Sequence, residues 1–92
     1  MRRVAAVKFA KAFRRHVACP DETVAANSVG EALAAYFERY PMVRSYVVDE
    51  HFSVRRHVAL FVNDNQVIDR ESLTDPLMAG DTIHVFQALS GG

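Results

Sequence analysis

The chain has 92 residues, half of them hydrophobic, which is enough for one modest core and a single domain. Eleven basic residues balance eleven acidic ones, so no net charge attracts nucleic acid or an anionic membrane. The single cysteine, Cys19, excludes an internal disulfide and a four-cysteine iron–sulfur site. Basic residues interrupt the N-terminal apolar stretch, so we expect no signal peptide or membrane span and a cytoplasmic location.

The first part of the chain predicts two strands. Residues 4–13 place Val7 and Phe9 on one face with a lysine on the other, which is the period of a half-buried strand. A second strand is predicted over residues 16–24. Pro20 interrupts it, and because proline cannot donate a ladder hydrogen bond, this strand should lie at an edge or carry a bulge.

A helix is predicted next. Ser28 and Glu31 have the spacing of a capping box, in which the two side chains satisfy free amides at a helix start. Pro41 cannot continue the helical hydrogen bonds, so the helix should end near Tyr40. Its apolar residues form a single stripe: Val29, Leu33, Tyr36, Phe37 and Tyr40.

The remainder of the chain predicts three more strands. Residues 46–48 fit either a short strand or a turn of helix, and residues 42–57 have no clear pattern. Residues 58–62 alternate as a strand, a turn follows, and residues 67–68 can return as a short fourth strand. After a tight loop around Leu73-Thr74-Asp75-Pro76-Leu77, a final strand is predicted over residues 83–86.

This order of elements is typical of the β-grasp fold. The β-grasp is an α+β fold in which a mixed sheet, here of four or five strands, packs on one main helix. We expect residues 1–87 to form this single domain and residues 88–92 to form a flexible tail.

The tail itself suggests a function. It contains Leu89, Ser90, Gly91 and Gly92, and glycines without side chains can pass through a narrow channel. With a pKa of about 3.3–3.7, the α-carboxyl of Gly92 is an anion at neutral pH and a poor electrophile. A nucleophile could attack it only after conversion to a derivative with a better leaving group, such as an adenylate.

Several short motifs, taken together, resemble one family. They are Ser28-Val29-Gly30-Glu31-Ala32-Leu33, Phe37-Glu38-Arg39-Tyr40-Pro41, Phe61-Val62-Asn63, residues 73–81 and the terminal Ser90-Gly91-Gly92. In this order and at this spacing the chain resembles the MoaD/ThiS family of ubiquitin-like sulfur carriers. It differs from short ThiS proteins by an insertion after the helix, as in longer MoaD-like and CysO-like carriers. It also lacks the proline that often precedes the two glycines.

The resemblance implies a role as a carrier or subunit that has no catalysis of its own. It implies that a MoeB/ThiF-type enzyme adenylates Gly92 with ATP and that a persulfide sulfur then replaces AMP to form a thiocarboxylate. The implied partners are this adenylating enzyme, a sulfur donor (rhodanese or cysteine desulfurase) and a downstream sulfur-accepting enzyme. No bound cofactor or metal is expected, because the spacing of the four histidines matches no zinc pattern.

A partner-binding patch is predicted on the sheet. If Val58 and Ile83 face the helix, then Phe61, His84 and Phe86 face outward on neighbouring strands, and we expect Ile68 at their flank. Exposed aromatic pairs on a small protein mark a partner site. The alternative is that the insertion, residues 42–56, folds over them as a satellite core.

Three functions remain open at this point. The first is sulfur donation, for molybdopterin as the small synthase subunit or for another pathway such as cysteine or secondary-metabolite synthesis. The second is a ubiquitin-like modifier joined through Gly92 to lysines of target proteins; the chain's only two lysines are Lys8 and Lys11. The third is a β-grasp interaction module with incidental glycines.

Overall fold

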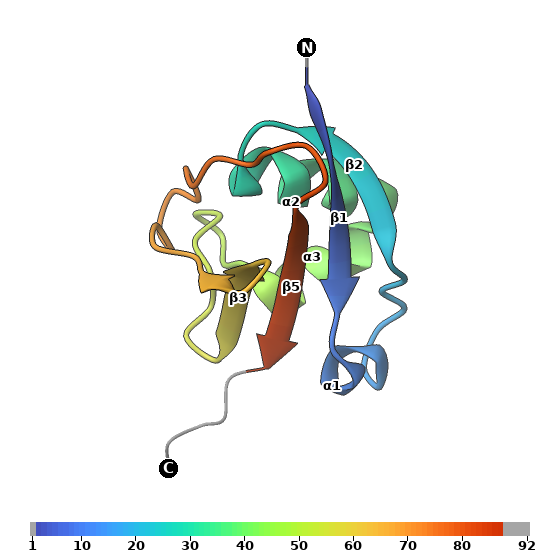
Figure 1. Cartoon of the computed structure of the whole chain (residues 1–92). Helices are drawn as coiled ribbons and strands as arrows, with labels where there is room; N and C mark the ends of the chain where they lie inside the picture. The colour runs from blue at the N-terminus through green and yellow to red at the C-terminus, as the bar shows by residue number, and fades with distance from the viewer. Residues whose placement is uncertain (1, 88–92) are drawn as a thin grey trace.

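A computed structural model describes residues 2–87 and shows a mixed five-stranded sheet (Figure 1). The strand order is β2-β1-β5-β3-β4. The central pair, β1 and β5, is parallel, and the other neighbours are antiparallel. In chain order the strands are β1 (Arg3–Phe9), β2 (Glu22–Ala26), β3 (Val58–Val62), β4 (Asn65–Gln66) and β5 (Thr82–Gln87).

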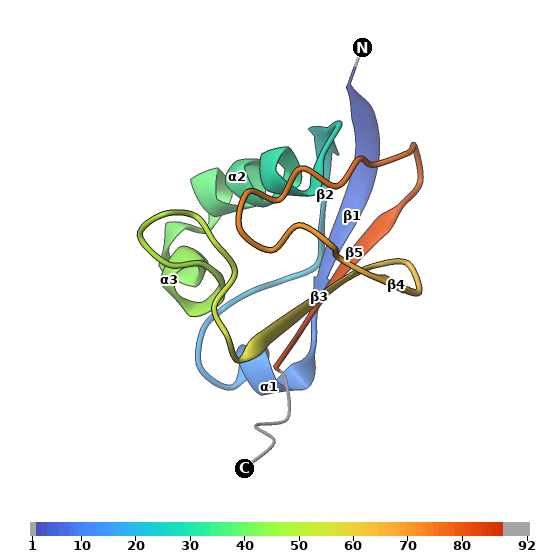
Figure 2. The same ribbon diagram turned by 90° about the vertical axis from the view of Figure 1, so that its left-hand side faces the viewer.

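The main helix, α2 (Val29–Arg39), covers one face of this sheet (Figure 2). Its start is fixed as the sequence predicted: the Glu31 amide donates to the Ser28 hydroxyl at 3.2 Å, while the Glu31 carboxylate accepts from the Asn27 amide. Tyr40 ends the helix immediately before Pro41. The β-grasp fold predicted from the sequence is therefore confirmed.

The prediction that the first strand continues to residue 13 is wrong. β1 ends at Phe9, and a short helix, α1 (Lys11–Arg14), follows. The turn of helix brings Phe13 back over Phe9, with ring centroids 5.8 Å apart, and buries it. The second predicted strand is also displaced, because it begins at Glu22 rather than at residue 16.

Tertiary contacts explain where β2 begins. The Pro20 carbonyl accepts a hydrogen bond from the Tyr36 hydroxyl at 2.8 Å, which ties the segment before Glu22 to α2. As predicted, β2 is an edge strand. The short fourth strand is Asn65–Gln66 and not residues 67–68, since Asn63 takes a left-handed conformation (φ 54°) that makes the turn tighter than expected.

The insertion forms a 3₁₀ turn, η1 (Pro41–Val43), and a helical turn, α3 (Arg44–Val47). Residues 46–47 are thus helical, and Val48 forms an isolated bridge with Val54. Both views place α3 on the same side of the sheet as α2 (Figures 1 and 2). The insertion therefore enlarges the core beneath the main helix.

The connection between β4 and β5 is held by carboxylates. Asp69 accepts hydrogen bonds from the Ser72 amide and from the amide and hydroxyl of Thr74, and these bonds hold the pKa of Asp69 below its usual value. Leu73, between them, is buried although its φ is 55°, a conformation that costs energy in a residue with a Cβ. The Asp69 bonds offset that cost.

Candidate functional site

The outer face of the sheet carries three aromatic rings in contact. Phe61 on β3 lies opposite His84 on β5, and Phe86 lies two residues further along. The Phe61 and Phe86 rings meet edge to face with centroids 5.7 Å apart, and His84 stacks on Phe86 at 5.9 Å. We call Phe61, His84 and Phe86 the outer aromatic patch.

The alternation predicted for the last strand is confirmed. Ile83 and Val85 have no exposed surface and face α2, whereas Phe86 remains 41% exposed. Strand geometry is the cause, because successive side chains point to opposite faces and only one face is covered by helices. The patch therefore keeps a large apolar ring in contact with water.

The alternative that the insertion covers these rings is wrong. Phe52 of the insertion packs on Phe37 of α2, with ring centroids 5.9 Å apart, and Val43 and Val47 are fully buried in the main core. All three residues therefore lie on the helical side of the sheet. The outer aromatic patch is left open in the part of the chain that the structure describes.

Ile68 stands apart from the patch in its contacts. A shallow hollow of about 400 Å³ is lined by Phe61, His84 and Phe86 together with Asn63 and Asp64, and Ile68 is not among its lining residues. Ile68 is 90% exposed, and its amide donates to the Asp75 carboxylate. The polar edge of the hollow, at Asn63 and Asp64, was not predicted, because the turn that brings them there is tighter than the pattern suggested.

The predicted reactive residues, Leu89, Ser90, Gly91 and Gly92, lie outside the described residues 2–87. What the structure fixes is the point from which they leave. β5 pairs with β3 as far as Gln87, opposite Val58, one residue beyond Phe86 (Figure 1). The outer aromatic patch thus lies at the end of β5, the strand that precedes the tail in the sequence.

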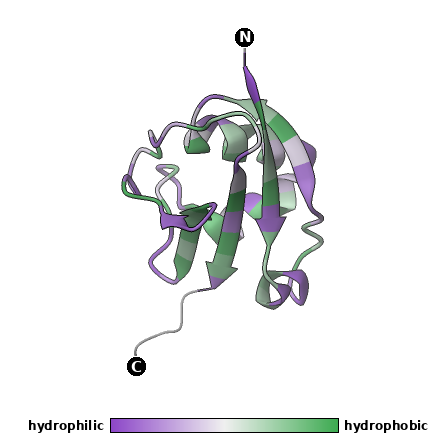
Figure 3. Ribbon diagram, viewed as in Figure 1, coloured by the Kyte–Doolittle hydropathy of each residue, from purple (hydrophilic) through white to green (hydrophobic). Residues whose placement is uncertain are grey.

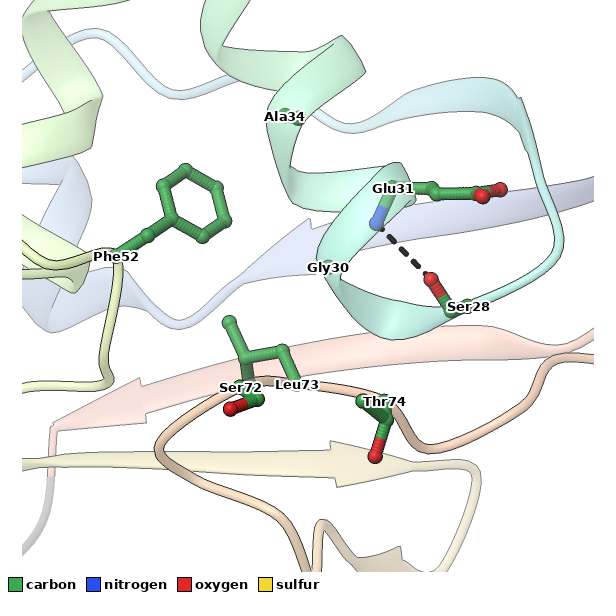
Figure 4. Close-up of a pocket in the computed structure, with 8 residues that line it drawn as sticks. All are labelled: Ser28, Gly30, Glu31, Ala34, Phe52, Ser72, Leu73 and Thr74. Atoms are coloured by element: carbon green, nitrogen blue, oxygen red, sulfur yellow. Dashed lines mark hydrogen bonds between the residues drawn. The ribbon is translucent and has the colours of Figure 1, made fainter.

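A second depression, which the sequence did not reveal, lies on the helical side. It is a groove of about 590 Å³ between the start of α2, the loop at Leu73 and Phe52 (Figure 4). The first helical amides do not point freely into it, since Val29 donates to the Asp75 carbonyl and Gly30 to the Leu73 carbonyl. A Cβ at Gly30 would lie 3.1 Å from that Leu73 oxygen, so this glycine serves close packing. The sequence signal for this close packing was Gly30 itself, because a glycine in the first turn of a helix is unusual unless another segment approaches closely.

Other candidates lack the features of a reactive site. Burial raises the pKa of the Cys19 thiol, which disfavours the nucleophilic thiolate. Within residues 2–87 no group of three or more His, Cys, Asp or Glu side chains could hold a metal ion. No helix in the same range has the length and apolar character needed to cross a bilayer.

Several solved structures share this architecture. SAMP1, the small archaeal modifier protein 1 of Haloferax volcanii, superposes with a TM-score of 0.78 at 22% identity, over 97% of this chain and 99% of that one. A chain of the Amycolatopsis orientalis BexX/CysO complex superposes with a TM-score of 0.79 at 22% sequence identity, over 96% of this chain and 99% of that one. Mycobacterium tuberculosis CysO, described as an antigen, superposes with a TM-score of 0.77 at 18% sequence identity, over 92% of this chain and 99% of that one. No curated protein sequence matches the chain.

The strand order and the superposition on these structures define a β-grasp fold of the ubiquitin-like type. The profile of the ThiS family matches residues 12–92, which is most of the chain and includes both terminal glycines. The chain therefore belongs to the ThiS family, and the resemblance seen in its motifs is confirmed.

Proposed function

We propose that this protein is a sulfur carrier whose C-terminal Gly92 is adenylated by a MoeB/ThiF-type enzyme and converted to a thiocarboxylate. One observation carries the proposal: β5 leads from the core to a Ser-Gly-Gly sequence, with an open aromatic patch one residue before the strand ends. The family match through residue 92 supports the same role for the tail.

The chemistry divides between the carrier and its partner. In the first step a Gly92 carboxylate oxygen attacks the α-phosphorus of ATP and releases pyrophosphate. In the second step a persulfide sulfur attacks the acyl carbon and AMP leaves. The product is an acyl disulfide between Gly92 and the sulfur donor. A second thiol of the partner then attacks the donor's sulfur, forms a disulfide with it and releases the thiocarboxylate on Gly92. ATP and sulfur donor both belong to partners, and this chain supplies the acyl group and the docking surface.

Docking through the outer aromatic patch would present the tail to the enzyme. Five residues, 88–92, span at most about 17 Å when extended, enough to enter an active site while the domain remains outside. Binding through the patch makes delivery of Gly92 effectively intramolecular, which raises its local concentration at the active site. The downstream acceptor would be a third enzyme, with molybdopterin synthase as one candidate.

Exact-mass spectrometry tests this proposal. The protein is incubated with its cognate activating enzyme, ATP and a sulfur donor, and it should exchange one terminal oxygen for sulfur. Oxidation adds nearly the same mass, so the thiocarboxylate is also trapped by alkylation. A variant without Gly92 is the control and should remain unchanged. A wild-type carboxylate that stays fully unmodified would contradict the proposal.

Protein modification is the second candidate. The similarity to a protein named as an archaeal modifier favours it, because a modifier uses the same activated carboxylate and differs only in the acceptor. In that case Gly92 would be recovered in isopeptide bonds to lysines of other proteins. Peptide mapping of cells that contain both the protein and its activating enzyme, with a search for glycine–lysine conjugates, separates the two functions.

A further inference from the structure

Two basic segments far apart in the sequence meet where the tail begins. β1 runs parallel to β5 and β3 runs antiparallel, so the residues after β1 and those before β3 lie at the end where β5 finishes. In Figure 1, α1 and the start of β3 lie at the same end of the molecule as the end of β5. The strand order places β5 between them.

These segments carry exposed cations around the exit of the tail. α1 and its end contribute Lys11 and Arg15, the residues before β3 contribute Arg56, and Lys8 projects from the outer face of β1. Hydrophilic residues are visible on α1 in Figure 3. Lys8 also borders a small hollow that Phe86 lines. We call Lys8, Lys11, Arg15 and Arg56 the basic collar.

Three acidic side chains close to these segments in the sequence or the sheet have polar partners of their own. Asp21 accepts from Arg14 at 2.7 Å, and Glu22 pairs with Arg39 at 3.2 Å and with the Tyr40 hydroxyl. Asp49, near Arg55, accepts the amides of His51 and Ser53. Across residues 2–87, none of the four collar residues takes part in an ion pair.

The opposite end of the sheet has a different arrangement of charge. Asp64 lies in the turn after β3, and Asp81 precedes β5 and is bonded to Asn63. Arg2 and Arg3 are also at that end, where β1 begins, far from α1 (Figures 1 and 2). A chain with zero formal net charge thus places four exposed cations, none of them in an ion pair within residues 2–87, around the end of β5.

We propose that the basic collar docks on an acidic rim around the tail-binding channel of the activating enzyme, with the outer aromatic patch filling an apolar centre inside that rim. This inference rests on the proposed function and adds the chemistry of the partner. Charges at the rim of an interface act mainly on the rate of association. A protein partner fits better than a nucleic acid because the collar borders an exposed apolar ring and net charge gives no long-range attraction to a polyanion.

Two double variants with the same change in net charge test the proposal. Lys11→Glu with Arg15→Glu reverses the collar, and Arg2→Glu with Arg3→Glu reverses the other end. Stopped-flow association with the cognate activating enzyme is measured at low and high salt. We expect the collar variant to lose about tenfold in association rate at low salt. The difference should vanish near 1 M salt, where the screening length is about 3 Å.

The controls separate folding, function and charge. Thermal melting reports whether each variant folds, and Arg56→Glu, on the other side of the tail, replaces the double variant if α1 is disturbed. Equal rate losses in both double variants would overturn the inference alone. Failure of the wild-type protein to be activated would overturn the proposed function and this inference with it. A third outcome is that the wild-type protein binds a single-stranded oligonucleotide tightly and only the collar variant loses this binding. That result would overturn the inference of a protein partner and indicate a nucleic-acid site.

Discussion

The two faces of β5 share one backbone but differ sharply in their exposure to solvent. Toward the helix, Ile83 and Val85 are fully buried among residues from α2 and the neighbouring strands. Toward solvent, His84 and Phe86 stack on each other, and Phe86 meets Phe61 across the strand pair. The inner residues are packed on all sides, whereas the outer ring keeps 41% of its surface exposed.

We expect this contrast to separate stability from recognition within six residues. Removing an inner side chain leaves a cavity, which lowers the free energy of unfolding. Removing an outer ring leaves the core intact but deletes the apolar area that a partner could bury. The insertion strengthens the same division, since it adds Val43, Val47 and Phe52 to the inner side and nothing to the outer one.

We expect the largest loss of activation from changes in the C-terminal tail, which follows β5 in the sequence. Deletion of Gly92, or replacement of Gly91 with tryptophan, should abolish activation, because the reacting carboxylate is displaced or the side chain cannot enter a narrow channel. ATP–pyrophosphate exchange measures activation, and thermal melting on the same samples measures folding. Loss of the fold together with activity would show that the tail contributes to the core.

The outer face is tested by Phe86→Ala. We expect binding to the activating enzyme to weaken by about 2 kcal/mol or more, as for a central aromatic anchor, with a smaller change in folding stability. Calorimetric binding and chemical denaturation are compared on the same variant. Ile68→Ala is the matched control, since Ile68 is more exposed than Phe86 and does not line the hollow beside it.

The inner face is tested by Val85→Ala, one residue away. The free energy of unfolding should fall by roughly 1–3 kcal/mol through loss of packing, while binding by the folded protein stays close to wild type. Denaturant unfolding at fixed temperature measures the loss. If Phe86→Ala proves the more destabilising of the two, the division between the faces is wrong.

The smallest effect concerns the loop that carries Leu73 under α2. Hydrogen bonds lower the folded-state pKa of Asp69, so the stability that they confer is present above the unfolded pKa of about 3.9. That stability is lost as the pH falls below this value toward the folded pKa. Asp69→Asn should therefore flatten the acid side of the melting profile.

Melting temperatures measured from pH 6 down to about pH 3 test this expectation. Asp64→Asn, in an exposed turn, is the matched control. Only part of the acid dependence should disappear in the Asp69 variant, because hydrogen bonds from Met78 and Asn63 also lower the pKa of Asp81. An unchanged profile would show that the Asp69 bonds do not stabilise the loop.

The sequence alone determined the elements whose signals are local. Ser28 and Glu31 specify the start of α2 through bonds within one turn, and Pro41 specifies its end because it lacks an amide hydrogen. Alternation likewise placed Val85 inside and Phe86 outside, since strand geometry reverses side chains at each residue. The terminal glycines are also plain in the sequence, although their role remains a proposal.

Only the tertiary structure decided features that depend on distant contacts. Residues 10–13 have strand-like alternation, but burying Phe13 against Phe9 required a turn of helix. The start of β2 depends on the bond from Tyr36 to Pro20, sixteen residues away. The basic collar depends on strand order, because the segments that carry Arg15 and Arg56 flank the end of β5 only once β5 lies between β1 and β3. Local patterns cannot encode such proximity, which arises when separate segments share one core.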